Sequence, residues 1–143
     1  MKKCMKMLKT TTSVVIAVMF MIILVSLPSR AAEEFYKGHA TAYCLPGTTA
    51  SGLPVQPGIC AMNKQVVKEQ GLMGKTVVLY QRLPDGTRGA ELGTYEIADT
   101  GCKKNVIDVW FEDLEQCQQF MNKVYEDGCK GKIFYEIKEE ETE

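Results

Sequence analysis

The apolar and polar residues of the chain alternate or cluster in short segments, a pattern that predicts a domain built mainly from β-strands. Each segment has about the four to eight residues that are typical of a strand. The predicted strands cover residues 39–44, 59–62, 75–81, 93–98, 106–111 and 132–137. Between the third and fourth of them, the sequence Leu83-Pro-Asp-Gly-Thr87 predicts a turn that sends the chain back.

Two segments have a helical period instead. Asp113, with Gln116 three residues later, resembles a capping box, and the apolar residues that follow recur on one helical face. That face consists of Leu114, Cys117, Phe120, Met121 and Val124, and the helix ends at Asp127-Gly128. A shorter helix is predicted from its N-cap Asn63 to Gln70. Six short strands without a regular strand–helix alternation predict a small barrel rather than a layered α/β fold.

The N-terminal segment has the features of a signal peptide. Four lysines and no acidic residue occur in residues 1–9, and residues 14–27 are apolar apart from Ser26. Pro28 then breaks the helix, and small residues near Ala31 suit cleavage there. The alternative is an uncleaved anchor, but this apolar core is shorter than the roughly 20 residues that span a bilayer. We therefore predict a signal peptide over 1–31 and an exported protein, with membrane contact only through an uncleaved segment.

The rest of the chain is predicted to be one domain with short ends. Residues 32–37 form a polar lead, 38–137 the domain, and 138–143 an acidic tail. The first 31 residues hold five of the 17 basic residues and no acid, so 12 basic and 18 acidic residues remain, a net charge of −6. An acidic domain without basic patches repels phosphate backbones, which excludes nucleic acid as the expected partner.

The cysteines fit an oxidising compartment. Five of them remain after the signal segment and are candidates for disulfides: Cys44, Cys60, Cys102, Cys117 and Cys129. Because five is an odd number, at least one thiol is free or pairs with another chain, and the sequence does not choose among the pairings. His39 is the only histidine and no CxxC pair occurs, so no metal site is predicted, and no cofactor is expected.

Two carboxylates are candidates for chemistry. Asp99 lies at the end of a predicted strand that runs into Gly101, where it either caps the turn or belongs to a site. Asp108 is flanked by Val106, Ile107, Val109 and Trp110. Its side chain either points to solvent by simple alternation or lies in an apolar cleft that raises its pKa. If the two carboxylates are close, one of them is a candidate for the protonated acid that glycosidic bond cleavage requires.

Six motifs in one order suggest a family. They are Ala40-Thr-Ala-Tyr43, Thr49-Ala-Ser-Gly52, Gly58-Ile-Cys-Ala-Met-Asn63, Gly74-Lys-Thr-Val-Val78, Ala98-Asp-Thr-Gly101 and Ile107-Asp-Val109. Over about residues 38–137 this arrangement resembles the three-aspartate (3D) domain, which occurs in wall proteins and is similar to the catalytic core of membrane-bound lytic murein transglycosylase A. The resemblance implies a six-stranded double-psi β-barrel, a secreted or cell-wall location, and peptidoglycan glycan strands as the partner.

The resemblance also implies roles for individual residues. Asp108 corresponds to the family's general acid and base, and Asp99 to its middle aspartate. The predicted substrate-binding residues are Tyr43, Thr49, Ser51, Asn63 and Thr100. Loop Thr and Ser are also common turn formers, and Tyr43 fits a core or groove-wall position as well. Two features depart from the family: Asn63 stands where the first aspartate is usual, and the segment between Asp99 and Asp108 is shorter.

Two functions from different classes are therefore open. The first is a glycan-cleaving enzyme of the lytic transglycosylase type, in which Asp108 acts as acid and then as base to give a 1,6-anhydro product. The second is a module that binds peptidoglycan or a protein on the same barrel without cutting. The state of Asp108 separates them, since an enzyme needs it partly buried near Asp99 and a binder leaves it freely solvated. The sequence does not indicate an oligomeric state.

Overall fold

The computed structural model describes residues 34–139, which lie within a compact unit that begins at Glu33. The predicted signal peptide and residues 140–143 of the predicted acidic tail lie outside the described residues. Within the described part, no helix is both long enough and apolar enough to cross a membrane. The unit has a core and a closed sheet of its own, so we expect it to fold without residues 1–32.

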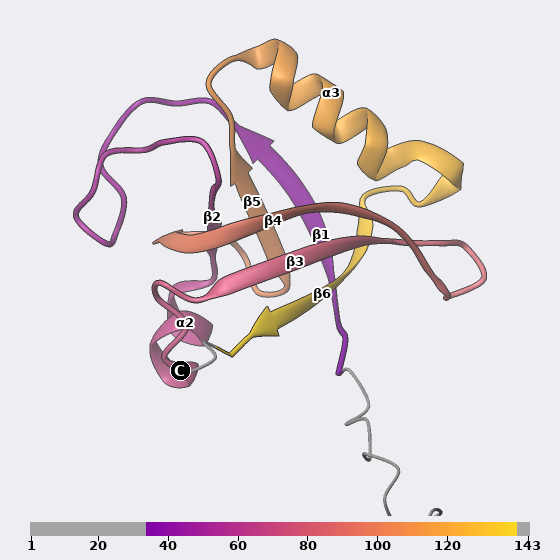
Figure 1. Cartoon of the computed structure of the whole chain (residues 1–143), viewed down its shortest axis with the longest axis horizontal. Coiled ribbons are helices and arrows are strands. Elements are labelled where there is room, and N and C mark those ends of the chain that lie inside the picture. The colour runs from indigo at the N-terminus through magenta and orange to yellow at the C-terminus, as the bar shows by residue number, and fades with distance from the viewer. Residues whose placement is uncertain (1–33, 140–143) are drawn as a thin grey trace, which may run out of the picture. The chain divides into compact units, whose positions relative to one another are not determined.

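The six predicted strands are present (Figure 1). They are β1 (Tyr36–Tyr43), β2 (Ile59–Met62), β3 (Thr76–Arg82), β4 (Arg88–Thr100), β5 (Val106–Trp110) and β6 (Lys132–Lys138). The largest difference from the prediction is β4, which begins at Arg88 instead of residue 93. Its first residues show no apolar alternation, but they pair with β3 on the far side of the predicted turn, where Arg82 lies opposite Arg88. Backbone pairing, rather than side-chain burial, extends this strand.

The strands close into a barrel in the order β1-β5-β2-β4-β3-β6. The β1/β5 and β2/β4 pairs are parallel, whereas β2/β5, β3/β4, β3/β6 and β1/β6 are antiparallel. Strands that are distant in sequence are thus neighbours in the sheet. The closed six-stranded barrel with this order is the predicted double-psi β-barrel. Closure leaves no strand of the barrel with an unpaired edge.

The interior of the barrel holds the main hydrophobic core. Fully buried aliphatic side chains from all parts of the sheet meet there, among them Val77, Leu79, Ile97, Ile107, Val109 and Ile133. Because successive side chains of a strand point to opposite faces, their neighbours Ala98, Asp108 and Trp110 face the outside of the barrel. A second, smaller apolar cluster of Ile59, Ala98 and Trp110 forms on this outer face.

Among residues 34–139, two α-helices accompany the barrel. α2 (Lys64–Gln70) begins at its N-cap Asn63 and ends at Gly71, which has the left-handed φ of 62° that favours glycine. α3 (Leu114–Tyr125) begins at Asp113, whose carboxylate accepts from the Gln116 backbone N–H at 2.8 Å, and a single 3₁₀ turn (Glu126–Gly128) follows it. Both predicted helices and both predicted N-caps are confirmed.

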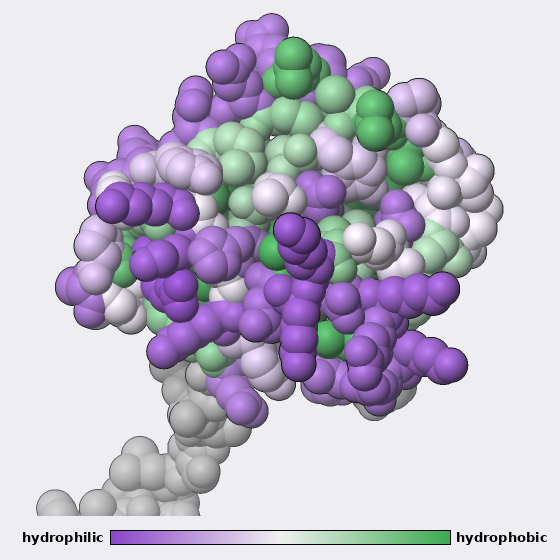
Figure 2. Space-filling view, turned by 180° about the vertical axis from the view of Figure 1, so that it is seen from behind, coloured by the Kyte–Doolittle hydropathy of each residue, from purple (hydrophilic) through white to green (hydrophobic). Residues whose placement is uncertain are grey.

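One residue of the predicted apolar face of α3 lies at the surface. Cys117, Phe120 and Val124 are buried as expected, but Leu114 is 73% exposed. It lies in the first turn, before the part of the helix that packs on the barrel. The apolar pattern of the sequence therefore extends further than the contact between the helix and the barrel. On the face seen in Figure 2, strongly hydrophilic residues gather in the lower half, whereas moderately hydrophobic residues adjoin one another across the upper half.

Candidate functional site

The candidate site lies on the outer face of the barrel, where the adjacent strands β1, β5, β2 and β4 meet the loop that follows β1. Three hydrogen bonds fasten this loop to the sheet. The Trp110 indole N–H donates to the Leu45 carbonyl at 2.9 Å, the Ser51 N–H donates to the Ala98 carbonyl at 3.1 Å, and the Ala50 N–H donates to the Asp99 carboxylate at 2.9 Å. The loop thereby forms one wall of the site.

Asp99 joins the loop to the strands. Its Oδ1 accepts from the backbone N–H groups of Ala50 and Thr100, at 2.9 and 2.8 Å, and its Oδ2 accepts from the Tyr43 hydroxyl at 3.3 Å. Burial raises the pKa of Tyr43, and the Asp99 charge raises it further, so the hydroxyl stays protonated as a donor. With three donors, Asp99 is held in one orientation and is both the turn-capping residue and a member of the cluster.

Asp108 is positioned by the parallel pairing of β5 with β1. Thr41 lies directly opposite it in the register, and the Thr41 hydroxyl donates to Asp108 Oδ1 at 2.7 Å. Within residues 34–139 we find no hydrogen bond to the second carboxyl oxygen, Oδ2. The side chain faces the outside of the barrel by alternation and is partly buried, so its position has features of both alternatives that the sequence left open.

The surroundings of Asp108 favour its protonated form. Burial raises the pKa of its carboxyl group above the ordinary value, the Thr41 hydrogen bond lowers it, and the nearby negative charge of Asp99 raises it again. Cys102 lies beside both carboxylates, with its thiol donating to the Ala61 carbonyl at 3.4 Å. Burial, followed by the Asp108 charge, raises the pKa of this thiol to about 11, so it is neutral at neutral pH and adds no charge.

Because these effects oppose each other, two substitutions are expected to shift the pKa of Asp108 in opposite directions. Thr41→Val removes the donor that favours the charged carboxylate, so we expect the pKa of Asp108 to rise. Asp99→Asn removes the neighbouring negative charge but keeps an acceptor for Ala50, so we expect the pKa of Asp108 to fall. NMR titration of the Asp108 carboxyl carbon in each variant measures both shifts. Shifts in the same direction would contradict this description of the site.

The predicted substrate-binding residues fall into two groups. Tyr43 and Thr100 lie in the cluster around Asp99. Thr49 and Ser51 lie in the loop, where their hydroxyls are 2.7 Å apart. The Thr49 hydroxyl also donates to the Leu53 carbonyl at 2.9 Å, and Thr49 is only 5% exposed, so its side chain holds the loop together.

Asn63 has a structural position next to the site. Its amide oxygen accepts from the backbone N–H groups of Gln65 and Val66, and its amide N–H donates to the Cys102 carbonyl at 3.0 Å. The side chain therefore caps α2 and fixes the segment between Asp99 and Asp108 at the same time. A role for Asn63 in substrate binding stays a prediction.

All five cysteines of the described unit are free thiols in the structure. Cys44, directly after β1, lies beside Cys117 of α3. Burial raises the pKa of the Cys117 thiol, and its hydrogen bond with Cys44 contributes in the same direction. Disulfide formation stays a prediction, and the fold makes Cys44 and Cys117 the first pair to test. Within residues 34–139, no cluster of three or more His, Cys, Asp or Glu suits a metal ion.

Sequence reasoning missed two members of the cluster. Thr41 was not recognised because its contact with Asp108 depends on the pairing of strands that are 67 residues apart. The alternation of Thr41 and Tyr43 on one face of β1 was the available signal. Cys102 was considered only as a disulfide candidate, although its place between Asp99 and Asp108 in the sequence already put it near both.

No family model matches the chain, and no curated protein matches it either. Similar solved structures include an expansin of Clavibacter michiganensis without ligand, with 19% identity and a TM-score of 0.48. A point mutant of that expansin in complex with cellohexaose has 17% identity and a TM-score of 0.48; each alignment covers 77% of this chain and 53% of the expansin chain. Streptomyces papain inhibitor has 16% identity and a TM-score of 0.47, over 74% of this chain and 96% of the inhibitor.

The chain thus spans about half the length of the expansin chains it matches. The strand order and register define the class of the domain by themselves. It is a small double-psi β-barrel with a carboxylate cluster on its outer face.

Proposed function

We propose that the domain cleaves glycan strands of peptidoglycan in the manner of a lytic transglycosylase. The observation that carries this proposal is the state of Asp108, which is partly buried, lies near a second carboxylate and has a raised pKa. A carboxyl group in this state keeps its proton at a pH where an ordinary aspartate has lost it, as a general acid must. The resemblance to the three-aspartate domain supports the choice of substrate, and the apolar N-terminal segment supports export.

The proposed reaction uses one carboxyl group twice. Asp108 first donates its proton to the oxygen that bridges MurNAc and GlcNAc, and the bond from MurNAc C1 to that oxygen breaks. The resulting Asp108 carboxylate then takes the proton of the MurNAc 6-hydroxyl as that oxygen bonds to C1. The products are a 1,6-anhydro MurNAc end and a free GlcNAc hydroxyl, and Asp108 regains its proton without net use of water.

Asp99 has a positioning role in this proposal. Its three hydrogen bonds hold Tyr43 and the loop beside Asp108, and its charge raises the pKa of the acid. Replacement of the family's first aspartate by Asn63 does not remove the proton donor. The Asn63 side chain instead caps α2 and donates to the Cys102 carbonyl, which fixes the shortened segment before Asp108.

A second candidate function is a non-catalytic module that binds peptidoglycan or a protein on the same barrel. The observations that favour it are the engagement of Asn63 in capping and the burial of Thr49, because both leave fewer polar groups for positioning a substrate. A single assay separates the candidates. Purified peptidoglycan is incubated with residues 32–143, and the sediment and the soluble fraction are analysed separately. Soluble glycan fragments indicate cleavage, whereas protein in the sediment without soluble fragments indicates binding alone.

A further inference from the structure

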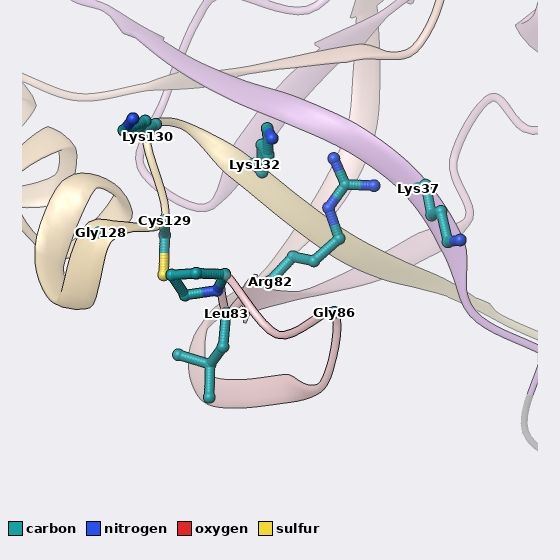
Figure 3. A pocket seen from close by; sticks show the side chains of 9 residues that line it. Lys37, Arg82, Leu83, Gly86, Gly128, Cys129, Lys130 and Lys132 are labelled. Carbon is teal, nitrogen blue, oxygen red and sulfur yellow. The ribbon is translucent and has the colours of Figure 1, made fainter.

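A cavity of about 560 Å³ shares no lining residue with the carboxylate cluster. Figure 3 shows the side chains that line it. The cavity forms where β1 begins, β3 ends and β6 begins. The turn after β3 and the segment before β6 close its sides. Its lining residues are Lys37, Arg82, Leu83, Pro84, Gly86, Gly128, Cys129, Lys130 and Lys132. The volume is within the range of about 300–1,000 Å³ that is usual for small-molecule sites.

The charge of this cavity is opposite to that of the domain. Four of its lining residues are cations, and none is acidic. Residues 32–143 carry only 12 basic residues against 18 acidic ones, so a third of the available cations line one cavity. Like charges repel one another, and Leu83 and Pro84 give the cavity an apolar wall that strengthens electrostatic interactions within it. Binding of an anion would relieve this repulsion.

Arg82 is held in place for such a contact. Its guanidinium lies 5.8 Å from the centre of the Phe134 ring, a cation–π contact that limits its freedom. In Figure 3 the guanidinium lies between the side chains of Lys132 and Lys37 in this view. A planar guanidinium that lines the same cavity as three lysines suits the oxygens of a phosphate group, which Arg contacts with two parallel N–H donors.

The left-handed backbone at residue 130 makes a lysine there energetically unfavourable. Lys130 has a φ of 52°, a left-handed conformation that favours glycine, and it lies immediately before Gly131, with a φ of 79°. A side chain with a β-carbon in this conformation costs about 1–2 kcal/mol. Glycine at position 130 would avoid this cost, so the lysine adds charge to the cavity at the expense of stability.

We infer that this cavity is a binding site for a small anion that bears phosphate groups. The cations come from β1, β3, β6 and the segment before β6, so the site depends on the folded barrel and not on one stretch of sequence. The inference is independent of glycan cleavage, because neither Asp99 nor Asp108 takes part. Free diphosphate and a phosphate on a lipid headgroup present the same chemistry to these residues.

The test uses residues 33–143, so that the apolar N-terminal segment cannot contribute to membrane binding. Calorimetric titration with inorganic diphosphate at low salt measures the free anion, and co-sedimentation with vesicles of phosphatidylglycerol and phosphatidylcholine measures the lipid phosphate. We expect Lys130→Gly and Lys132→Glu each to weaken binding about tenfold, the value of one charge-assisted contact. Lys64→Glu is the matched control, since this exposed lysine in the first turn of α2 lies outside the cavity and an acid is well tolerated there.

Lys130→Gly distinguishes a loss of binding affinity from a loss of fold stability. Because it relieves the left-handed strain, its thermal unfolding midpoint is expected to equal or exceed that of the native domain even as the affinity falls. Saturable binding of diphosphate or of the anionic vesicles, weakened about tenfold in both cavity variants and unchanged in Lys64→Glu, supports the site, and the probe that binds identifies the source of the phosphate. No binding of either probe, or an equal loss in Lys64→Glu, would overturn it.

Discussion

Asp108→Asn is expected to reduce the release of soluble glycan fragments from peptidoglycan by about 10²–10⁴-fold, the usual contribution of a general acid or base. The asparagine side chain has nearly the same shape and still accepts the Thr41 hydrogen bond, so the substitution removes the transferable proton and little else. The rate of fragment release by the native and variant domains measures the effect. A variant that retains more than a tenth of the native rate would exclude Asp108 as the acid.

The stability of the same variant is its control. The folded state raises the pKa of Asp108, so the unfolded chain loses this proton at a lower pH than the folded domain does. The native domain therefore loses stability as the pH rises from the ordinary carboxyl range through the pKa of the folded state. Asp108→Asn avoids this loss. Its thermal unfolding midpoint at neutral pH is expected to equal or exceed that of the native domain, and the difference should disappear at about pH 3.

Leu79→Ala is expected to have the largest effect on stability. Leu79 is fully buried at the centre of the barrel, on β3 between β4 and β6, so truncation removes apolar contacts and leaves a cavity. Such substitutions cost about 2–5 kcal/mol, which for a domain of this size corresponds to a fall of roughly 10–30 °C in the unfolding midpoint. Thermal and urea unfolding of residues 33–143 measure it.

Leu114→Ala is the matched control for this prediction. It makes the same chemical change at a position that is 73% exposed in the first turn of α3. Its expected effect is within about 0.5 kcal/mol, because alanine is a good helix former and little surface is uncovered. Similar losses in the two variants would contradict the placement of the core inside the barrel.

The strands and helices were predictable because each has a local cause. Alternation defines β5, a capping aspartate begins α3, and the Pro-Asp-Gly turn separates β3 from β4. The first five residues of β4 were missed because their place in the sheet comes from pairing and not from burial. Leu114 belongs to the apolar face of α3 but is exposed, because a helical period does not indicate where the surface that the helix packs against ends.

The site was predictable in its carboxylates but not in its geometry. Asp99 and Asp108 were identified from their sequence context, but the Thr41 hydroxyl reaches Asp108 only through the parallel β1/β5 register. The structural roles of Asn63 and Thr49 also depend on partners that the sequence does not indicate, such as the Cys102 carbonyl. The cationic cavity was not predicted at all, because its lysines and arginine are scattered from residue 37 to residue 132.

The glycan-cleavage proposal rests on an Asp108 that donates a proton and then accepts one, without a water molecule entering the product. The most direct test is mass spectrometry of the fragments released from purified peptidoglycan by residues 32–143 in water enriched in heavy oxygen. We predict 1,6-anhydro MurNAc ends that carry no heavy oxygen and are absent with Asp108→Asn. Release of no fragments, or of reducing ends that carry heavy oxygen, would contradict the proposed transglycosylase reaction.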